Sequence, residues 1–211
     1  MDWIVWERRF EDFLHVQMEG DAGHDLAHIH RVVKSAKELA GIENAKLEVV
    51  IPAAWLHDCV TVAKDSPDRS RASRIAAESA VTFLTSQNYP PEYLDAIAHA
   101  IEAHSFSANI PTQSKEAEVV QDADRLDSLG AIGIARCLMT GVSLNRRLYD
   151  PSDPFADNRP PDDAQGSIEH FYTKLLTLAG TMKTAAGKAE AEKRSAYMEG
   201  FLAQLRGEIG K

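Results

Sequence analysis

The apolar stretch Ile51-Pro52-Ala53-Ala54-Trp55-Leu56 runs directly into the polar pair His57-Asp58. The first six residues are typical of a buried helix, whereas an imidazole and a carboxylate are costly to bury without partners. A metal ion can be a partner for both groups. The stretch therefore predicts a core helix over residues 46–58 whose end faces a polar site, and Pro52 is expected to bend this helix or to delay its start.

Apolar residues recur at helical spacing along most of the chain, and strand-type alternation persists nowhere. This periodicity predicts an all-α protein. Gly41 is expected to end the second helix. Residues 141–166, which hold four of the nine prolines, are predicted to form an ordered but irregular loop. The expected helices span residues 2–18, 25–40, 46–58, 70–87, 90–104, 115–140, 167–182 and 185–208.

The composition favours one globular domain over residues 1–211, with 44% hydrophobic residues available for a core. The net charge of −9 and the lack of a dense Lys/Arg cluster argue against broad nucleic-acid binding. Cys59 and Cys137 provide no disulfide framework. Neither a signal peptide nor a long apolar segment is evident, so we expect a cytoplasmic protein that makes no membrane contact. Whether it forms a homodimer is open.

His28, the pair His57-Asp58 and the carboxylates of "QDADRLD" (residues 121–127) each lie in or at the end of a predicted helix. Adjacent residues point in different directions on a regular helix, but a helix end relaxes this constraint. Imidazole and carboxylate together suit Mn, Fe, Co, Ni or Zn and, less well, Mg. Three or four protein ligands leave coordination positions for a water molecule whose pKa the metal lowers. The pattern predicts one divalent ion and leaves a second open.

The order His, His-Asp, Asp resembles the HD-domain phosphohydrolase superfamily. The flanking text resembles its small stand-alone bacterial members, and the resemblance runs from about Gly23 to the C-terminus. It implies an HD-domain helical bundle, with a core over about 20–140 on which the irregular loop and the helices of 167–208 pack. The similar blocks are "GHDLAHIHRV" (23–32), "AAWLHD" (53–58), "IEAHSFS" (101–107), "QDADRLDSLGAIGIAR" (121–136) and "LYDPSDPFADNRPPDD" (148–163).

The resemblance also implies an activity, the hydrolysis of (deoxy)nucleoside triphosphates to monophosphate and pyrophosphate by a metal-activated water. Three alternatives stay open: a nucleoside monophosphate phosphatase, a di-iron oxygenase of the HD type, and a non-catalytic metal- or nucleotide-binding module. The oxygenase would require His99 and His104 to converge as additional ligands. The expected partner is a small phosphorylated molecule, most simply a nucleotide.

The resemblance implies the roles of Asp124 and Asp127, and position and charge near the metal ligands suggest the other roles. Asp124, in "ADR", is the expected fourth metal ligand beside His28, His57 and Asp58. His104, Asp127 and Lys64 are the candidate catalytic residues, with Asp127 orienting a ligand or a water. The candidate substrate-binding residues are His24, Arg31, Lys64 and Arg69.

Some of these roles have ordinary alternatives. His24 could cap its own helix, and Lys64 could be a solvated loop residue. Some nucleotidase relatives carry a Glu three residues after the Asp of the His-Asp pair, where this chain has Thr61. The nucleotidase mechanism therefore does not transfer directly, and His104 or Asp127 would have to position the water.

Overall fold

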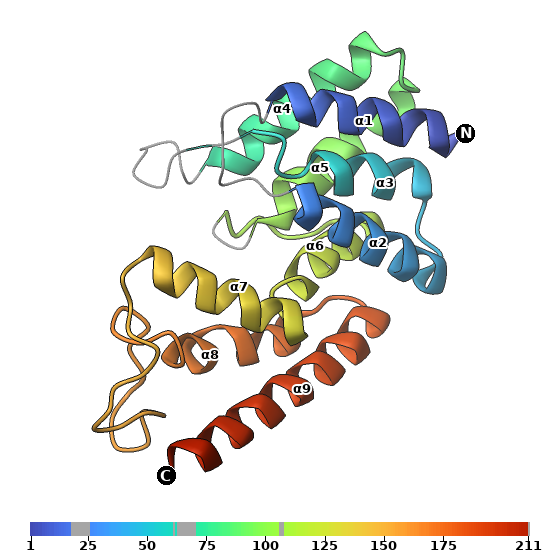
Figure 1. The fold of residues 1–211 in the computed structure, drawn as a ribbon. Helices are drawn as coiled ribbons and strands as arrows, with labels where there is room; N and C mark the ends of the chain where they lie inside the picture. The colour runs from blue at the N-terminus through green and yellow to red at the C-terminus, as the bar shows by residue number, and fades with distance from the viewer. Residues whose placement is uncertain (18–25, 61, 63–70, 106–107, 211) are drawn as a thin grey trace. The chain divides into compact units, whose positions relative to one another are not determined.

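The computed structural model describes residues 1–17, 26–60, 62, 71–105 and 108–210 (Figure 1). These residues are helical or irregular, and their only β-type pairing is an isolated bridge between Arg147 and Gly166. The prediction of an all-α protein is confirmed. None of the described helices has the length and hydropathy needed to cross a membrane.

The chain forms two compact units, Met1–Asp124 and Arg125–Lys211. The expectation that the C-terminal helices pack on one HD-type core stays a prediction. The N-terminal unit contains α1 (Trp3–Gln17), α2 (Leu26–Glu43), α3 (Leu47–Leu56), α4 (Ala72–Ser86), the 3-10 turn η2 (Pro91–Tyr93), α5 (Leu94–His104) and all but the last two residues of α6 (Lys115–Leu126).

Helix α3 is the centre of the N-terminal unit, because it contacts α1, α2, α4 and α5. Every residue from Val49 to Leu56 is buried, as its apolar sequence predicts. The helix begins at Leu47, so Pro52 does not delay its start. Proline lacks the N–H that would bond to the carbonyl of Glu48. The hydroxyl of the buried Tyr89 donates to that carbonyl instead, over 2.7 Å.

The end of α2 differs from the prediction. The helix continues through Gly41 to Glu43, and the following Asn44 has a left-handed backbone with φ of 55°. Asparagine tolerates this conformation better than most residues because its short side chain can bond locally. Asn44 therefore ends the helix three residues after the expected position.

The predicted helix over 115–140 is two helices, α6 and α7 (Gly130–Ser143). The break has a backbone cause, because Gly130 adopts φ of 69°, a conformation that interrupts a right-handed helix. The first turn of α7 then lies against the chain that precedes it. A Cβ atom on Gly133 would lie 2.2 Å from the carbonyl oxygen of Ser128.

The C-terminal unit also contains α8 (Glu169–Thr173), the 3-10 helix η3 (Leu175–Thr181) and α9 (Ala185–Ile209). The predicted helix over 167–182 is thus broken at Lys174, whose φ of −138° and ψ of −59° lie outside the helical region. Helix α9 packs against α7 and η3. Its start is capped by Thr184, whose hydroxyl accepts a hydrogen bond from the amide of Gly187 over 2.9 Å.

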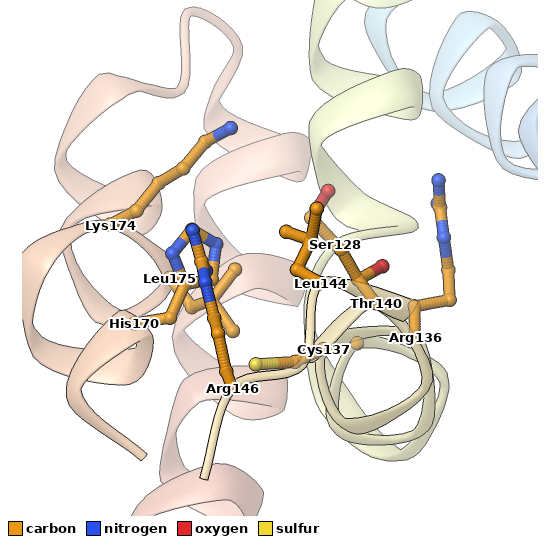
Figure 2. A pocket seen from close by; sticks show the side chains of 10 residues that line it. Ser128, Arg136, Cys137, Thr140, Leu144, Arg146, His170, Lys174 and Leu175 are labelled. Atoms are coloured by element: carbon orange, nitrogen blue, oxygen red, sulfur yellow. The ribbon is translucent and has the colours of Figure 1, made fainter. Parts of the chain in front are cut away.

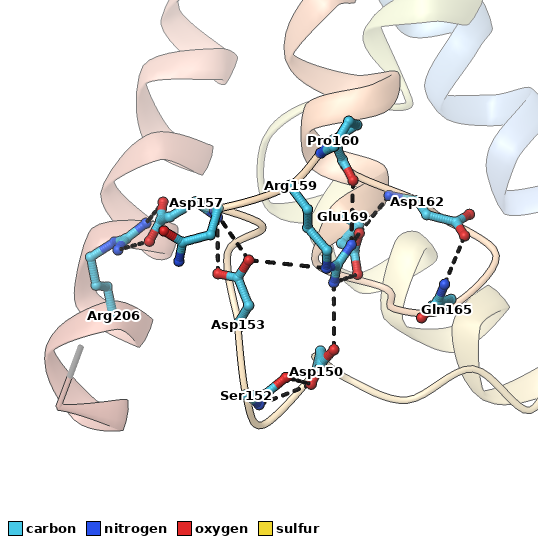
Figure 3. A network of polar contacts seen from close by, with 11 residues as sticks. Asp150, Ser152, Asp153, Asp157, Arg159, Pro160, Asp162, Gln165, Glu169 and Arg206 are labelled. Atoms are coloured by element: carbon cyan, nitrogen blue, oxygen red, sulfur yellow. Dashed lines mark hydrogen bonds and ion pairs between the residues drawn. The ribbon is translucent and has the colours of Figure 1, made fainter.

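The proline-rich segment before α8 is held in place by charged side chains, a feature that the sequence analysis did not predict (Figure 3). The guanidinium of Arg159 donates to both carboxylate oxygens of the buried Glu169, at 2.6 and 2.8 Å. The same guanidinium lies 3.7 Å from Asp150. Arg206 of α9 donates to Asp157 at 2.7 and 3.0 Å. These bidentate pairs hold the loop to two helices of its own unit.

The two helical glycines Gly133 and Gly200 provide a matched test of this packing. We expect Gly133→Ala to lower the free energy of unfolding by about 1–3 kcal/mol, because the added methyl group collides with a backbone carbonyl. Gly200 of α9 has no atom within 4 Å of its Cβ position. Gly200→Ala should therefore stabilise the protein by about 0.5–1 kcal/mol. Urea unfolding measures both, and equal effects would contradict the described start of α7.

Candidate active site

Five polar side chains from four segments of the N-terminal unit meet at one place. His28 comes from α2, and His57 and Asp58 directly follow α3. His104 is the last residue of α5, and Asp124 lies in the last turn of α6. Three of them stand at or beyond a helix end, where the side chain is no longer restricted to one face of a regular helix.

The facing atoms of this cluster lie within 3.4–3.8 Å of one another in pairs. His57 Nε2 is 3.4 Å from His28 Nε2, and Asp124 Oδ1 is 3.5 Å from His28 Nε2 and 3.8 Å from His57 Nε2. Asp58 lies between two imidazoles: its Oδ2 is 3.7 Å from His57 Nε2 and its Oδ1 is 3.6 Å from His104 Nε2.

Two of the imidazoles are oriented by the backbone in the same way. His57 Nδ1 contacts the carbonyl oxygen of Ala54 at 2.9 Å, and His104 Nδ1 contacts the carbonyl oxygen of Ile101. Each carbonyl belongs to the residue three positions earlier, in the last turn of the helix, and a carbonyl can only accept. Both Nδ1 atoms must therefore carry hydrogen, which directs each Nε2 atom toward the cluster.

Burial and mutual charge shift the protonation of the cluster. Burial lowers the pKa of the fully enclosed His57, so its Nε2 keeps a lone pair. Burial also opposes charge on His104, but its hydrogen bond to Asp58 outweighs this and raises its pKa. Burial alone would raise the pKa of Asp58; the neighbouring His57 and the hydrogen bond from His104 hold it below its usual range instead. Both shifts favour a charged pair, an anionic Asp58 beside a protonated His104.

This donor set fits a divalent cation. One ligand atom each from His28, His57 and Asp58 lie within 4.8 Å of one another, a spacing that a single ion can bridge. The facing Nε2 atoms of His28 and His57 would repel if both presented lone pairs with nothing between them, and a cation satisfies both. Mixed imidazole and carboxylate donors suit the transition metals from Mn to Zn.

The other candidate residues lie elsewhere. His24, Thr61, Lys64 and Arg69 are outside the described residues. Arg31 is half-buried in α2, three residues after His28. Asp127 belongs to the C-terminal unit, where its buried carboxylate accepts a hydrogen bond from Arg136. The roles assigned to these residues stay predictions.

His99 does not join the cluster through Nε2, because this atom accepts a hydrogen bond from the amide of Gln113 over 3.0 Å. The convergence of His99 with His104 that the oxygenase alternative would require is thus not seen through this atom. The carbonyls of Ala54 and Ile101, which orient two imidazoles, were missed by sequence reasoning. Every residue has a backbone carbonyl, so residue type does not identify these two acceptors. The only sequence signal is a histidine at or just after the predicted end of a helix.

Comparison with known proteins agrees with this arrangement. The model of the HD domain family matches residues 25–129, a span that contains all five cluster residues. The chain belongs to the HD domain family. YpgQ of Bacillus subtilis is 34% identical over 193 residues, which make up 89% of this chain and 85% of YpgQ. The expectation of an HD-superfamily hydrolase is confirmed by the match to the HD domain family together with the similar solved structures described next.

Those solved structures cover nearly the whole chain. The HD-superfamily hydrolase of Bacillus thuringiensis superimposes with a TM-score of 0.77 at 36% identity and covers 100% of this chain and 99% of its own. YpgQ of B. subtilis, solved in complex with ADP, gives a TM-score of 0.72 at 32% identity, with 95% and 97% covered. A protein of Lactobacillus plantarum gives 0.70 at 32% identity, with 96% and 97% covered.

Proposed function

We propose that this HD-family hydrolase is a metal-dependent phosphohydrolase that converts nucleoside triphosphates to monophosphate and pyrophosphate. The observation that carries the proposal is the convergence of His28, His57, Asp58 and Asp124 within hydrogen-bonding to ion-pair distance. The complex of the relative YpgQ with ADP supports a nucleotide as the ligand.

The four converging residues would hold one divalent ion, through His28 Nε2, His57 Nε2 and the carboxylates of Asp58 and Asp124. When bound, a divalent ion lowers the pKa of water and offsets negative charge on phosphoryl oxygens. Asp58 is also held by His104, whose Nε2 lies 3.6 Å from its Oδ1. Such support fixes a ligand in the geometry that the ion requires.

His104 has a separate role in this proposal. Its Nδ1 contacts a backbone carbonyl, and its pKa is raised by the hydrogen bond to Asp58, which favours a proton on the Nε2 that faces this carboxylate. An N–H at this position can orient a water molecule or contact a phosphate oxygen. Water then adds to the α-phosphorus and releases a proton to the solvent, the bond from phosphorus to the bridging oxygen breaks, and that oxygen leaves with pyrophosphate. Lys64, six residues after Asp58 in the sequence, is proposed to neutralise charge on the leaving group.

The first prediction concerns the ion. The double variant His57→Ala/Asp58→Ala should lose most of its bound divalent metal, because it removes two of four ligands, and metal content falls from about one ion per chain to a small fraction of that. His15→Ala is the matched control, since His15 is exposed on α1. Metal analysis of dialysed protein gives the result, with circular dichroism to verify the fold. Full metal occupancy in the folded double variant would refute this ligand set.

The second prediction concerns the products. With Mn, Mg, Co or Ni present, nucleoside triphosphates should yield monophosphate and pyrophosphate in equal amounts, and the His57→Ala/Asp58→Ala variant should release neither. Chromatography of the nucleotides and a coupled pyrophosphate assay measure both. Orthophosphate release from monophosphates, with triphosphates untouched, would instead establish the monophosphatase alternative.

The third prediction concerns His104. His104→Ala should lower turnover by roughly 10²-fold or more, because positioning and acid-base effects are of that order, with the metal content unchanged. A parallel fall from two ions to one would show that His104 binds a second metal. His99→Ala is the control in the same helix and should keep near-normal turnover. Normal turnover in folded His104→Ala would remove this residue from the mechanism.

A further inference from the structure

The C-terminal unit contains a cavity of about 320 Å³ that the proposed hydrolytic chemistry does not use (Figure 2). We call it the α7 cavity, since most of its wall belongs to α7 and the chain on either side of it. Its size is near the lower end for small-molecule pockets, which run from roughly 300 to 1,000 Å³. It is lined by Ser128, Gly133, Arg136, Cys137, Thr140, Leu144, Arg146, His170, Lys174 and Leu175.

The wall of the α7 cavity is cationic. Arg136, Arg146 and Lys174 contribute permanent positive charge, and none of the ten described lining residues is acidic. In Figure 2, Lys174 lies on the same side of the cavity as His170, Arg136 lies on the opposite side, and Arg146 lies between them on the chain that follows α7. This enrichment stands out in a chain of net charge −9. Residues 125–211 hold twelve basic and eleven acidic residues, so the acidic excess lies before them.

Two acidic residues outside the lining, Asp127 and Asp163, hold the side chains of two lining residues in place. Asp127 is buried and accepts from the guanidinium of Arg136. Asp163 contacts Nδ1 of His170 at 2.6 Å, and the hydroxyl of Thr173 donates to the same carboxylate oxygen over 3.3 Å. Asp163 thus holds the ring of His170 from outside the cavity. A wall whose side chains are held in place by buried or bonded partners loses less entropy when it binds a ligand.

Arg146 is the third cation in the wall of the α7 cavity. It is half-buried, and its amide donates to the carbonyl of Gly141 at the end of α7 over 2.9 Å. Its guanidinium acts electrostatically on Asp163, which is already bonded to His170, and on the Cys137 thiol. A planar guanidinium binds phosphate through two parallel hydrogen bonds.

The rest of the lining suits the same class of ligand. Ser128 and Thr140 offer hydroxyl donors, and Leu144 and Leu175 offer a small apolar surface. We propose that the α7 cavity binds a small phosphate-bearing anion through Arg146, with Lys174 and Arg136 contributing charge. The ligand is either inorganic pyrophosphate or a nucleotide, and in a nucleotide the base and sugar would contact Leu144 and Leu175. The proposal concerns residues of the C-terminal unit alone, none of which belongs to the metal cluster, and it goes beyond the proposed hydrolysis.

The test uses the full chain carrying His57→Ala/Asp58→Ala, without divalent ions, so that the cluster cannot hold a ligand through metal. Titration calorimetry with inorganic pyrophosphate should show saturable binding that weakens as salt rises. Adding Arg146→Gln should weaken this binding by about 10- to 100-fold, because a charge-assisted contact is lost. Arg147→Gln is the matched control: Arg147 is the adjacent residue, exposed and outside the lining.

Each outcome decides the proposal. Loss of affinity in Arg146→Gln alone, with an unchanged melting temperature, supports it. Equal affinities in the Arg146 and Arg147 variants, or no saturable binding, overturn it. Titration with a nucleoside diphosphate, repeated in Leu144→Ala, then identifies the source of the phosphate. An effect of Leu144→Ala on the nucleotide alone points to a nucleotide ligand. None of these binding results depends on hydrolysis by the wild-type enzyme, so the two proposals fail separately.

Discussion

Two backbone carbonyls, at the ends of α3 and α5, set the chemistry of the metal-binding cluster. Each accepts the Nδ1 hydrogen of the histidine three residues later. The last carbonyls of a helix have no intrahelical donor, so they need such a partner. His57 and His104 provide these donors. Their Nδ1–H groups satisfy one carbonyl at the end of each helix, and this orientation directs both Nε2 atoms toward the cluster. The orientation of Asp58, which lies between those atoms, follows from the same arrangement.

The buried helix α3 makes this arrangement possible. Its contacts with α1, α2, α4 and α5 bring segments that are far apart in sequence to its C-terminal end. The pair His57-Asp58 follows directly after the apolar residues of this helix, where polar partners are within reach, and these partners limit the free-energy cost of burying the pair. Without a cation, the Nε2 lone pair of His57 faces the carboxylates of Asp58 and Asp124 at 3.7 and 3.8 Å. A divalent cation turns these unfavourable contacts into ligand bonds, and this is why we assign the cluster to metal-dependent hydrolysis.

Much of the fold could be predicted from sequence because helical periodicity is a local signal. The existence of most helices and the apolar character of α3 follow from it. The breaks at Gly130 and Lys174 could not be predicted, since each depends on a backbone conformation that suits the packing of the C-terminal unit. The candidate ligands were found because residue type and order identified them. The cations of the α7 cavity were missed, because Arg146 and Lys174 have no distinguishing pattern until the fold brings them together.

The central claim, that the residues from α2, α3 and α6 form one metal centre for nucleotide hydrolysis, is tested most directly by crystallography. Crystals grown with Mn²⁺ and a non-hydrolysable nucleoside triphosphate analogue would be measured at the manganese absorption edge. The claim predicts an anomalous peak within about 2.0–2.3 Å of the nitrogen and oxygen donors of His28, His57, Asp58 and Asp124, with phosphate oxygens beside it. A manganese peak elsewhere, or a nucleotide bound away from these four residues, would contradict it.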